Sequence, residues 1–167
     1  MKKPFLASIT ILVMLISVSI TPSAFAVEVG PYFGFSLGTA DDDILNEDDS
    51  GLKIFGGTNL SEQYGFEIAF VDLGEYVGGF IQQSGLAFDL VGYFPVAQNV
   101  DIFGKAGLFL WTFDQGPFTD DGTDLTYGFG VNIGLSNQMS VRAEWENFTD
   151  ISGGDVSLIS AGLTFNF

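Results

Sequence analysis

Large apolar residues alternate with small ones along much of this chain, most clearly in LTYGFGVNIGL at residues 125–135. Every second residue of that stretch is large and apolar, and the residues between are Gly, Thr or Asn. A period of two indicates a β-strand with two unlike faces. Because the second face has no charge and little side-chain volume, it suits a cramped interior better than a surface in water.

The same alternation recurs and predicts eight strands. Longer polar connections follow the odd-numbered strands, and short turns follow the even-numbered ones, as in an up-and-down meander. An even strand number and strands of about 9–11 residues or more suit an outer-membrane barrel. We therefore predict an all-β fold, an eight-stranded antiparallel up-and-down transmembrane β-barrel. The predicted strands are residues 29–40, 51–60, 64–74, 83–95, 100–113, 124–136, 139–149 and 156–167.

A barrel in a membrane determines which face of each strand meets lipid. A Lys or Arg facing lipid at the midplane costs about 2–4 kcal/mol, so the face with charges and glycines is predicted to line the lumen. One strand leaves two alternatives open. In residues 100–113, the face that carries Lys105 also carries Phe103, Phe109 and Trp111. Either these aromatics pack inside, or a bulge near Gly107 reverses the two faces.

Three basic residues lie within residues 27–167, and all fall on lumen-facing positions. Buried charges are tolerated when they are paired, so acidic partners are expected. The expected pairs are Asp89 opposite Lys105, Glu67 diagonal to Lys53, and Arg142 two residues from Glu144. Two interpretations remain open at this point: the pairs fill the lumen and fix the strand register, or they gate a narrow ion path.

The first 26 residues are predicted to be a signal peptide that is removed after Ala26. Lys2 and Lys3 form a positive n-region, an apolar run follows over residues 5–20, and Ala24-Phe25-Ala26 has the small residues of a cleavage site. The alternative is an uncleaved membrane anchor, because the apolar run is long. The barrel domain would then span residues 27–167, with three basic and 21 acidic residues, a formal charge of 3 − 21 = −18.

Composition excludes several classes of function. The chain has no Cys and no His, which removes disulfides, thiolate or imidazole metal sites, and catalysis by either residue. Five Lys and Arg residues against 21 acids give no basic footprint for nucleic acid. Glu144 and Glu146 could form an acid–base pair, but Arg142 on the same face neutralises them more simply. We predict no enzymatic activity and no cofactor.

The acidic segment DDDILNEDDSG (41–51) is the sharpest local feature, with oxygen ligands that Ca²⁺ or Mg²⁺ accept. Its spacing is not that of an EF-hand, and blocks of like charge usually repel one another. A solvated loop without metal is therefore the favoured interpretation, and DQGPFTDDGTD (114–124) is interpreted as a loop of the same kind. The candidate metal ligands are Asp41, Asp43, Glu47 and Asp49.

GLKIFGGTNLSEQYGFEIAFVDLGEY (51–76) resembles the second and third strands of small OmpA-like outer-membrane β-barrel proteins. LAFDLVGYFPV (86–96) and IFGKAGL (102–108) are similar to the fourth and fifth strands of that family. SLISAGLTFNF (157–167) resembles its C-terminal signal, which implies that Phe165 and Phe167 are recognised by the barrel assembly machinery. The resemblance does not extend to the peptidoglycan-binding domain of OmpA itself, so no cell-wall tethering is implied. The matching positions in 51–76 are Gly51, Lys53, Phe55, Gly57, Gly65, Glu67, Asp72, Leu73 and Gly74.

We therefore expect an integral outer-membrane protein with a structural, surface-exposed role and acidic extracellular loops. Its expected partners are outer-membrane lipid and lipopolysaccharide, together with the assembly machinery during biogenesis. The main alternative is a narrow porin-like channel for ions or small solutes. A soluble barrel that binds an apolar ligand is less consistent with the sequence, because it would place all three basic residues and the glycines outside.

Overall fold

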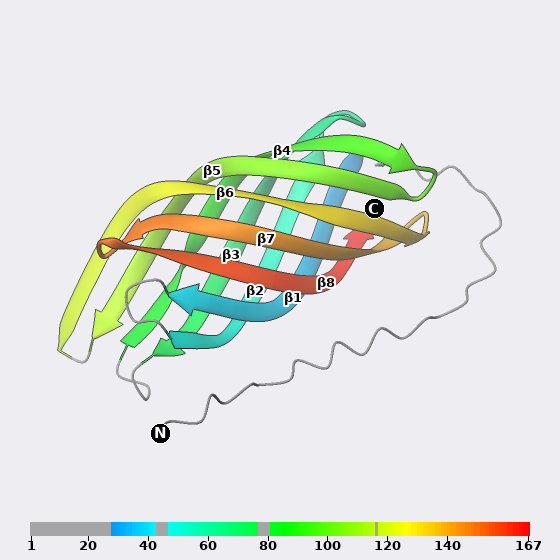
Figure 1. Ribbon diagram of the computed structural model, residues 1–167. Helices are drawn as coiled ribbons and strands as arrows, with labels where there is room; N and C mark the ends of the chain where they lie inside the picture. Colours follow the sequence, from blue (N-terminus) through cyan, green and yellow to red (C-terminus); the bar gives the residue numbers. More distant parts are fainter. Residues whose placement is uncertain (1–27, 43–46, 77–80, 116) are drawn as a thin grey trace, which may run out of the picture.

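The computed structural model describes residues 28–42, 47–76, 81–115 and 117–167. They form one closed barrel in which each strand pairs with its sequence neighbours and β1 pairs with β8 (Figure 1). All eight pairings are antiparallel, which confirms the predicted up-and-down barrel. The described residues include no helix that is long and apolar enough to cross a membrane. The strands are β1 Gly30–Asp42, β2 Glu47–Asn59, β3 Tyr64–Tyr76, β4 Ile81–Ala97, β5 Val100–Gln115, β6 Phe118–Ser136, β7 Met139–Ile151 and β8 Gly154–Asn166.

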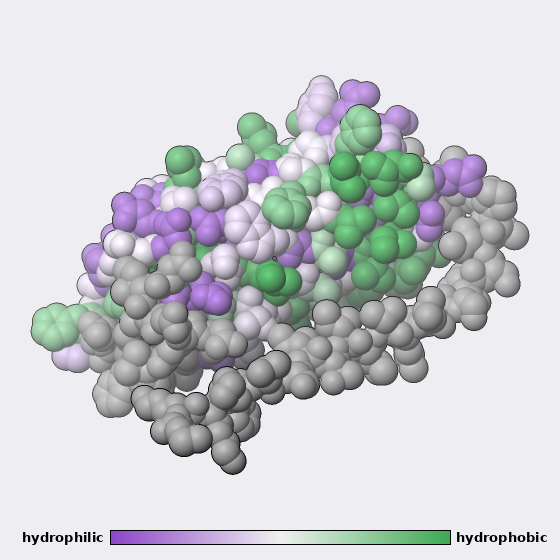
Figure 2. All heavy atoms as spheres, viewed as in Figure 1, coloured by the Kyte–Doolittle hydropathy of each residue, from purple (hydrophilic) through white to green (hydrophobic). Residues whose placement is uncertain are grey.

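The two faces of the strands follow the sequence alternation. In β6, Leu125, Tyr127 and Phe129 are exposed on the outside, whereas Thr126 and Gly128 are buried. In Figure 2, hydrophobic side chains gather toward the end of the barrel that carries the β6–β7 turn, on the right. Hydrophilic side chains predominate toward the β7–β8 turn, on the left. An apolar exterior of this kind fits hydrocarbon, and the small-residue face lines the lumen.

β5 keeps a single pair of faces along its length, which answers the question that its sequence left open. Phe103, Phe109 and Trp111 are all buried inside the barrel. The pairing of β5 with β4 and β6 runs through Gly107 without a register shift. Glycines on neighbouring strands make the room, because a Cβ at Gly130 would lie 2.5 Å from the Phe103 ring. The aromatics therefore pack inside, and β5 has no bulge near Gly107.

All four predicted polar loops are shorter than expected, since the strands on both sides of each extend into it. Most of 114–124 is strand, because β6 begins at Phe118. Side chains hold this extension together: Trp111 Nε1 donates to Asp124 Oδ2 at 2.8 Å, and Thr119 Oγ1 to Asp114 Oδ1 at 2.7 Å. Asp, Thr and Gly give little or mixed strand signal, so local propensity did not reveal these contacts between strands.

The connection predicted at residues 150–155 is a tight turn. Ile151 pairs with Gly154, which leaves Ser152 and Gly153 as the two turn residues. Their φ angles are 50° and 91°, the left-handed region that two-residue hairpin turns require. A glycine at position 153 therefore allows β7 and β8 to connect with almost no loop.

Candidate functional site: the charged centre of the lumen

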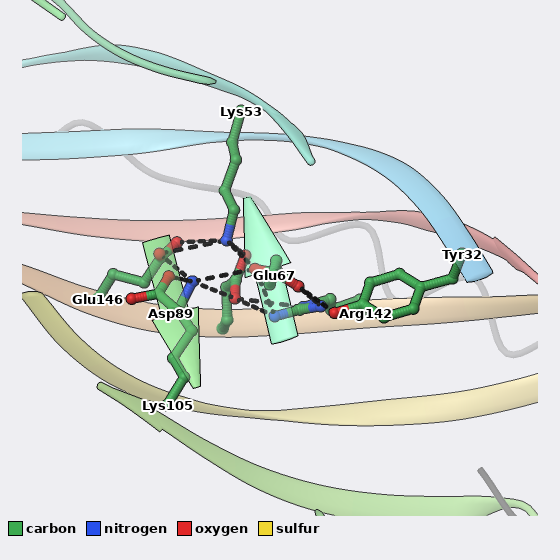
Figure 3. A network of polar contacts seen from close by, with 8 residues as sticks. Tyr32, Lys53, Glu67, Asp89, Lys105, Arg142 and Glu146 are labelled. Atoms are coloured by element: carbon green, nitrogen blue, oxygen red, sulfur yellow. Dashed lines mark hydrogen bonds and ion pairs between the residues drawn. The ribbon is translucent and has the colours of Figure 1, made fainter. Parts of the chain in front are cut away.

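A charge cluster lies in the middle of the lumen, contributed by β2, β3, β4, β5 and β7 (Figure 3). Its ion pairs join three cations to four carboxylates, and every participating side chain is at most 1% exposed. We use the name lumen cluster for these residues. They are Lys53, Glu67, Asp89, Lys105, Arg142, Glu144 and Glu146.

The two lysines each contact several carboxylates. Lys53 Nζ lies 2.7 Å from Glu144 Oε1, 3.1 Å from Glu146 Oε2 and 3.3 Å from Glu67 Oε1. Lys105 Nζ also pairs with Glu146, and it lies 3.4 Å from oxygens of Glu67 and Glu144. Each glutamate is therefore shared between cations, which compensates buried charge better than separate pairs would.

Arg142 connects the cluster to the aromatic residues beneath it. Its Nη1 donates to Glu67 Oε2 at 2.7 Å, and its Nη2 donates to Glu144 Oε2 at 2.9 Å. The guanidinium carbon lies 4.6 Å from the Phe55 ring centroid and 4.2 Å from that of Phe103. Tyr32 Oη donates to Glu67 Oε2 at 3.0 Å. The guanidinium is therefore held by two carboxylates and packs against two aromatic rings.

The structure brings together all six residues of the predicted pairs, although the register differs from the prediction. Lys105 lies opposite Val91, and Asp89 lies opposite Gly107, so the prediction that Asp89 and Lys105 are directly opposite was wrong. The turn occupies Gln98–Asn99 rather than 96–99, and the pairing shifts once between Pro95 and Ala97, so Asp89 lies opposite a residue two positions farther along β5 than predicted. Lys105 Nζ still reaches Asp89 Oδ2 diagonally at 3.5 Å.

The other predicted pairs also show that side-chain reach matters as much as register. Lys53 lies opposite Val71, and Glu67 lies opposite Gly57, yet the two charged groups meet at 3.3 Å. Long side chains from all sides of a narrow barrel converge on its axis. Glu146 was the partner that the sequence assigned to no pair, although it shares the lumen-facing side of β7 with Glu144.

Asp89 is the least supported member of the lumen cluster. Neither carboxylate oxygen has a hydrogen-bond partner among the described residues, and its ion pair with Lys105 is the longest in the cluster. With three cations against four carboxylates, the cluster holds one acid more than its cations match. Asp89, on β4 at the edge of the cluster, is therefore its weakest point.

An apolar layer fills the lumen on the side of the cluster that is nearer the β7–β8 turn. The rings of Phe109 and Phe148 lie 4.5 Å apart, and Leu73 and Leu158 are fully buried beside them. Polar groups are also buried at this end of the barrel, where Gln83 Nε2 donates to Asp42 Oδ2 at 2.9 Å. The buried apolar residues of the layer are Ala40, Val71, Leu73, Ala87, Phe109, Trp111, Phe148, Ile151, Val156 and Leu158.

A polar cavity of about 330 Å³ lies on the other side of the cluster. It is at the end of the barrel with the β2–β3, β4–β5 and β6–β7 turns, which we call the short-turn end. Tyr32, Tyr93 and Arg142 contribute to its lining, together with Asp101 and Asn132. The cavity therefore reaches the lumen cluster from one end only, and the apolar layer lies beyond the cluster.

The candidate metal ligands are only partly described. Asp41 is exposed, and Asp49 Oδ1 accepts a bond from the Ser50 amide at 2.7 Å. Asp43 and the side chain of Glu47 lie outside the described residues. Within the described ranges, no group of three or more acids is placed so that it could hold a metal ion.

The residues expected to form the assembly signal lie at the short-turn end of β8. Phe165 stacks on Phe33 of β1 with ring centroids 6.2 Å apart. Phe167 is 76% exposed, and its amide donates to Pro31 O at 3.1 Å. Both aromatics are therefore placed on the closing seam between β1 and β8, where the last strand meets the first.

The closed barrel, its apolar exterior and its charged lumen together define a small outer-membrane barrel protein. The chain belongs to the outer membrane protein beta-barrel domain family, whose model matches residues 10–167. No curated protein sequence matches the chain.

Solved structures share the fold at low sequence identity. The N-terminal β-barrel domain of OprF from Pseudomonas aeruginosa has a TM-score of 0.65 and 14% identity, and the match covers 83% of this chain and 98% of that one. Neisserial surface protein A also has a TM-score of 0.65 and 14% identity, with 82% and 96% covered. OprG from Pseudomonas aeruginosa has a TM-score of 0.63 and 12% identity, with 87% and 99% covered.

Proposed function

We propose that the protein is a plugged, non-catalytic outer-membrane barrel that presents an acidic end to the cell exterior. The observation that carries this proposal is the layered filling of the lumen. The lumen cluster closes the centre, and the layer around Phe109 and Phe148 closes the side toward the long hairpins. An eight-stranded barrel is just wide enough for side chains to fill it.

Physical cost supports a structural role for the lumen cluster. Removing one partner of a buried ion pair costs about 3–5 kcal/mol, because the survivor remains buried without compensation. An ion path through the lumen would have to separate Arg142 from Glu67 and Glu144 and then displace the apolar layer. Both steps act against conduction in the resting barrel.

A narrow channel is the second candidate, and the polar cavity at the short-turn end favours it. That cavity gives water access to the region of Arg142 from one side. Conduction would then require that the ion pairs of Arg142 separate and that the apolar layer rearranges.

Single-channel recording of the refolded barrel in planar bilayers separates the two functions. We expect no discrete openings from the unmodified protein. Truncating the layer with Phe109→Ala and Phe148→Ala is expected to raise leak, whereas Phe129→Ala on the lipid-facing side of β6 serves as the matched control. Regular openings of the unmodified protein would replace the plugged barrel with the channel.

We also propose that export involves cleavage after Ala26, so that the mature chain begins at Val27. Mass analysis of protein purified from the outer membrane should give that N-terminus, and an intact N-terminus would support the uncleaved anchor. Lipid and lipopolysaccharide are the proposed surroundings of the apolar exterior.

Assembly is proposed to depend on the aromatic end of β8. Deleting Phe167 should reduce the yield of folded, protease-resistant barrel much more than deleting Val27 does. Equal yields from the two truncations would exclude a role for Phe167 as an assembly signal.

A further inference from the structure

β6 extends farther than the strand beside it. It pairs with β5 from Phe118 to Ile133, but its pairing with β7 begins only at Thr126. Within the described ranges, residues 118–125 therefore have a β partner on one side alone. In Figure 1, β5 and β6 project past the β7–β8 turn, so no described strand pairs with the other side of β6 there. We call residues 118–125 the β6 edge.

The backbone groups of the β6 edge that face away from β5 can be identified from two hydrogen bonds. The Gly134 amide donates to Asn99 O at 2.8 Å on the β5 side, and β5 and β6 pair without a register shift. Even-numbered residues of β6 therefore bond toward β5, and odd-numbered ones point the other way. The carbonyl of Leu125, an odd-numbered residue, is consistent with this, because it accepts a hydrogen bond from Thr149 Oγ1 of β7 at 2.9 Å.

Thr119, Asp121 and Thr123 consequently direct their backbone groups to the open side. The Asp121 amide is bonded locally to Asp120 Oδ1 at 3.1 Å. Among the residues that the structure describes, the amides of Thr119 and Thr123 and the carbonyls of all three residues therefore have no strand partner and line the edge of the sheet. Such an edge is a template for an added strand.

The β6 edge lies beyond the apolar exterior of the barrel. On the outward face, Leu110 and Leu125 are the last large apolar residues of β5 and β6 in this direction. Beyond them the outward positions are Thr and Asp, and residues 118–121 are all exposed. A polypeptide in water can therefore reach the edge without entering the hydrocarbon.

Charge selects the kind of partner. Asp120 and Asp121 are exposed on opposite faces of the β6 edge, and Asp114 lies on the neighbouring strand. The three basic residues of the described chain are all buried in the lumen cluster, so none neutralises these acids. A second copy of this chain would bring like charges together, whereas a basic segment would be attracted.

We propose that the β6 edge binds an extended, lysine- or arginine-rich polypeptide segment as an additional strand. Main-chain hydrogen bonds to Thr119 and Thr123 supply the pairing, and the carboxylates of Asp120 and Asp121 select basic side chains. This binding proposal rests on the proposed function in one respect, namely that the acidic end of the barrel faces the cell exterior. Peptide binding to the barrel in detergent depends neither on conduction nor on orientation in a membrane. The experiment can therefore contradict strand binding at the β6 edge without contradicting the plugged barrel, and the reverse.

The first test is calorimetric titration of the full barrel in a neutral detergent with two synthetic peptides. One is an eight-residue peptide of alternating Lys and Thr, and the other replaces each Lys with Glu. We expect saturable binding of the Lys peptide that weakens as salt rises, and none of the Glu peptide. Equal binding of both peptides, or of neither, would overturn the proposal.

The second test separates strand addition from charge attraction. Thr123→Pro removes an amide that points away from β5, whereas Thr123→Ala keeps it, so only the proline variant should weaken binding, by roughly three- to tenfold. Asp120→Asn with Asp121→Asn should weaken binding more than Glu28→Gln with Glu62→Gln, the same change of charge at the other end. Equal affinity of the Thr123→Pro and Thr123→Ala variants excludes strand addition.

Hydrogen exchange in the unmodified protein gives a readout that does not depend on the folding of any variant. Added strands protect the amides that they bond, so the Lys peptide should slow exchange at Thr119 and Thr123. The amide of Gly122, which already faces β5, is the internal control and should not change. Binding without protection at Thr123 would show a purely electrostatic contact and would overturn the added strand.

Discussion

The lumen and the hairpin end, by which we mean the end of the barrel with the β7–β8 turn and the β6 edge, use the same acidic residue types in opposite ways. In the lumen, Glu67, Glu144 and Glu146 each contact at least two cations at no exposure to solvent. At the hairpin end, exposed carboxylates such as Asp120 and Asp121 have no cation near them among the described residues. The difference follows from solvation, since water supports a lone carboxylate and a dry lumen does not.

This contrast explains how a chain with so few basic residues folds with a charged core. All three basic residues of residues 28–167 lie in the lumen, where buried carboxylates need a cation to compensate their charge. The end of the barrel that carries the β6 edge is left strongly acidic as a consequence. Substitutions that remove charge should therefore have large effects in the lumen and small ones at the hairpin end.

The largest effect is expected from Arg142→Met. This change leaves Glu67 and Glu144 without their guanidinium donor, at a cost of about 3–5 kcal/mol in the free energy of unfolding. Urea unfolding of the barrel in lipid vesicles would measure it. Arg142→Lys keeps the charge but cannot donate to Glu67 and Glu144 with the planar geometry of a guanidinium, so we expect an intermediate loss of stability. A variant with Met that is as stable as the unmodified protein would contradict the structural role of the cluster.

The next effect is the coupling between Lys105 and Asp89. Lys105→Met removes a cation shared by four acids and should be strongly destabilising. Asp89→Leu should cost least of the single changes in the cluster, because Asp89 is its weakest member. In the double variant, we expect a coupling of about 0.5–3 kcal/mol that recovers only part of the loss, because three glutamates remain. Purely additive effects would show that the diagonal contact carries no energy.

A smaller effect is expected where a glycine makes room for the lumen packing. At Gly130, a Cβ would lie 2.4 Å from Ala143 O and 2.5 Å from the Phe103 ring. We expect Gly130→Ala to cost about 1–3 kcal/mol through overpacking. Gly104→Ala is the control, since its Cβ would meet its nearest neighbour at 3.9 Å on the outside. The comparison fails if both variants unfold at the same urea concentration.

The sequence predicted the faces of the strands better than their ends. Alternation is a local property, so it gave the faces of most strands, but in β5 the three large aromatics beside Lys105 left two alternatives open, which the structure decided in favour of aromatics packed inside. The direct pairing of Asp89 with Lys105 was wrong because register depends on the turn, and the turn residues Gln98 and Asn99 were not distinguished from their neighbours. The extension of β6 to Phe118 depends on contacts between strands, such as Trp111 with Asp124, that no local pattern encodes.

The lumen cluster was predictable as a set of residues but not as a network. The position of each charge on the strand gave its face, and the need for compensation predicted partners. The convergence of Lys53, Lys105 and Arg142 on shared glutamates depends on the curvature of the whole barrel. The same limit explains why Glu146, a residue on the expected face, was assigned to no pair.

The smallest effect is expected from Asp121→Asn on the β6 edge. The carboxylate is exposed and pairs with no cation in the described chain, so its removal should change the free energy of unfolding by less than about 0.5 kcal/mol. Glu144→Gln, also an isosteric loss of one charge, should be clearly destabilising in the same urea titration. The dependence on salt concentration distinguishes the two variants further. Raising the ionic strength screens the exposed acids but not the buried pairs. It should therefore reduce any change in the free energy of unfolding caused by Asp121→Asn and leave the loss caused by Glu144→Gln unchanged. Equal losses for the two variants would mean that burial does not separate the two regions.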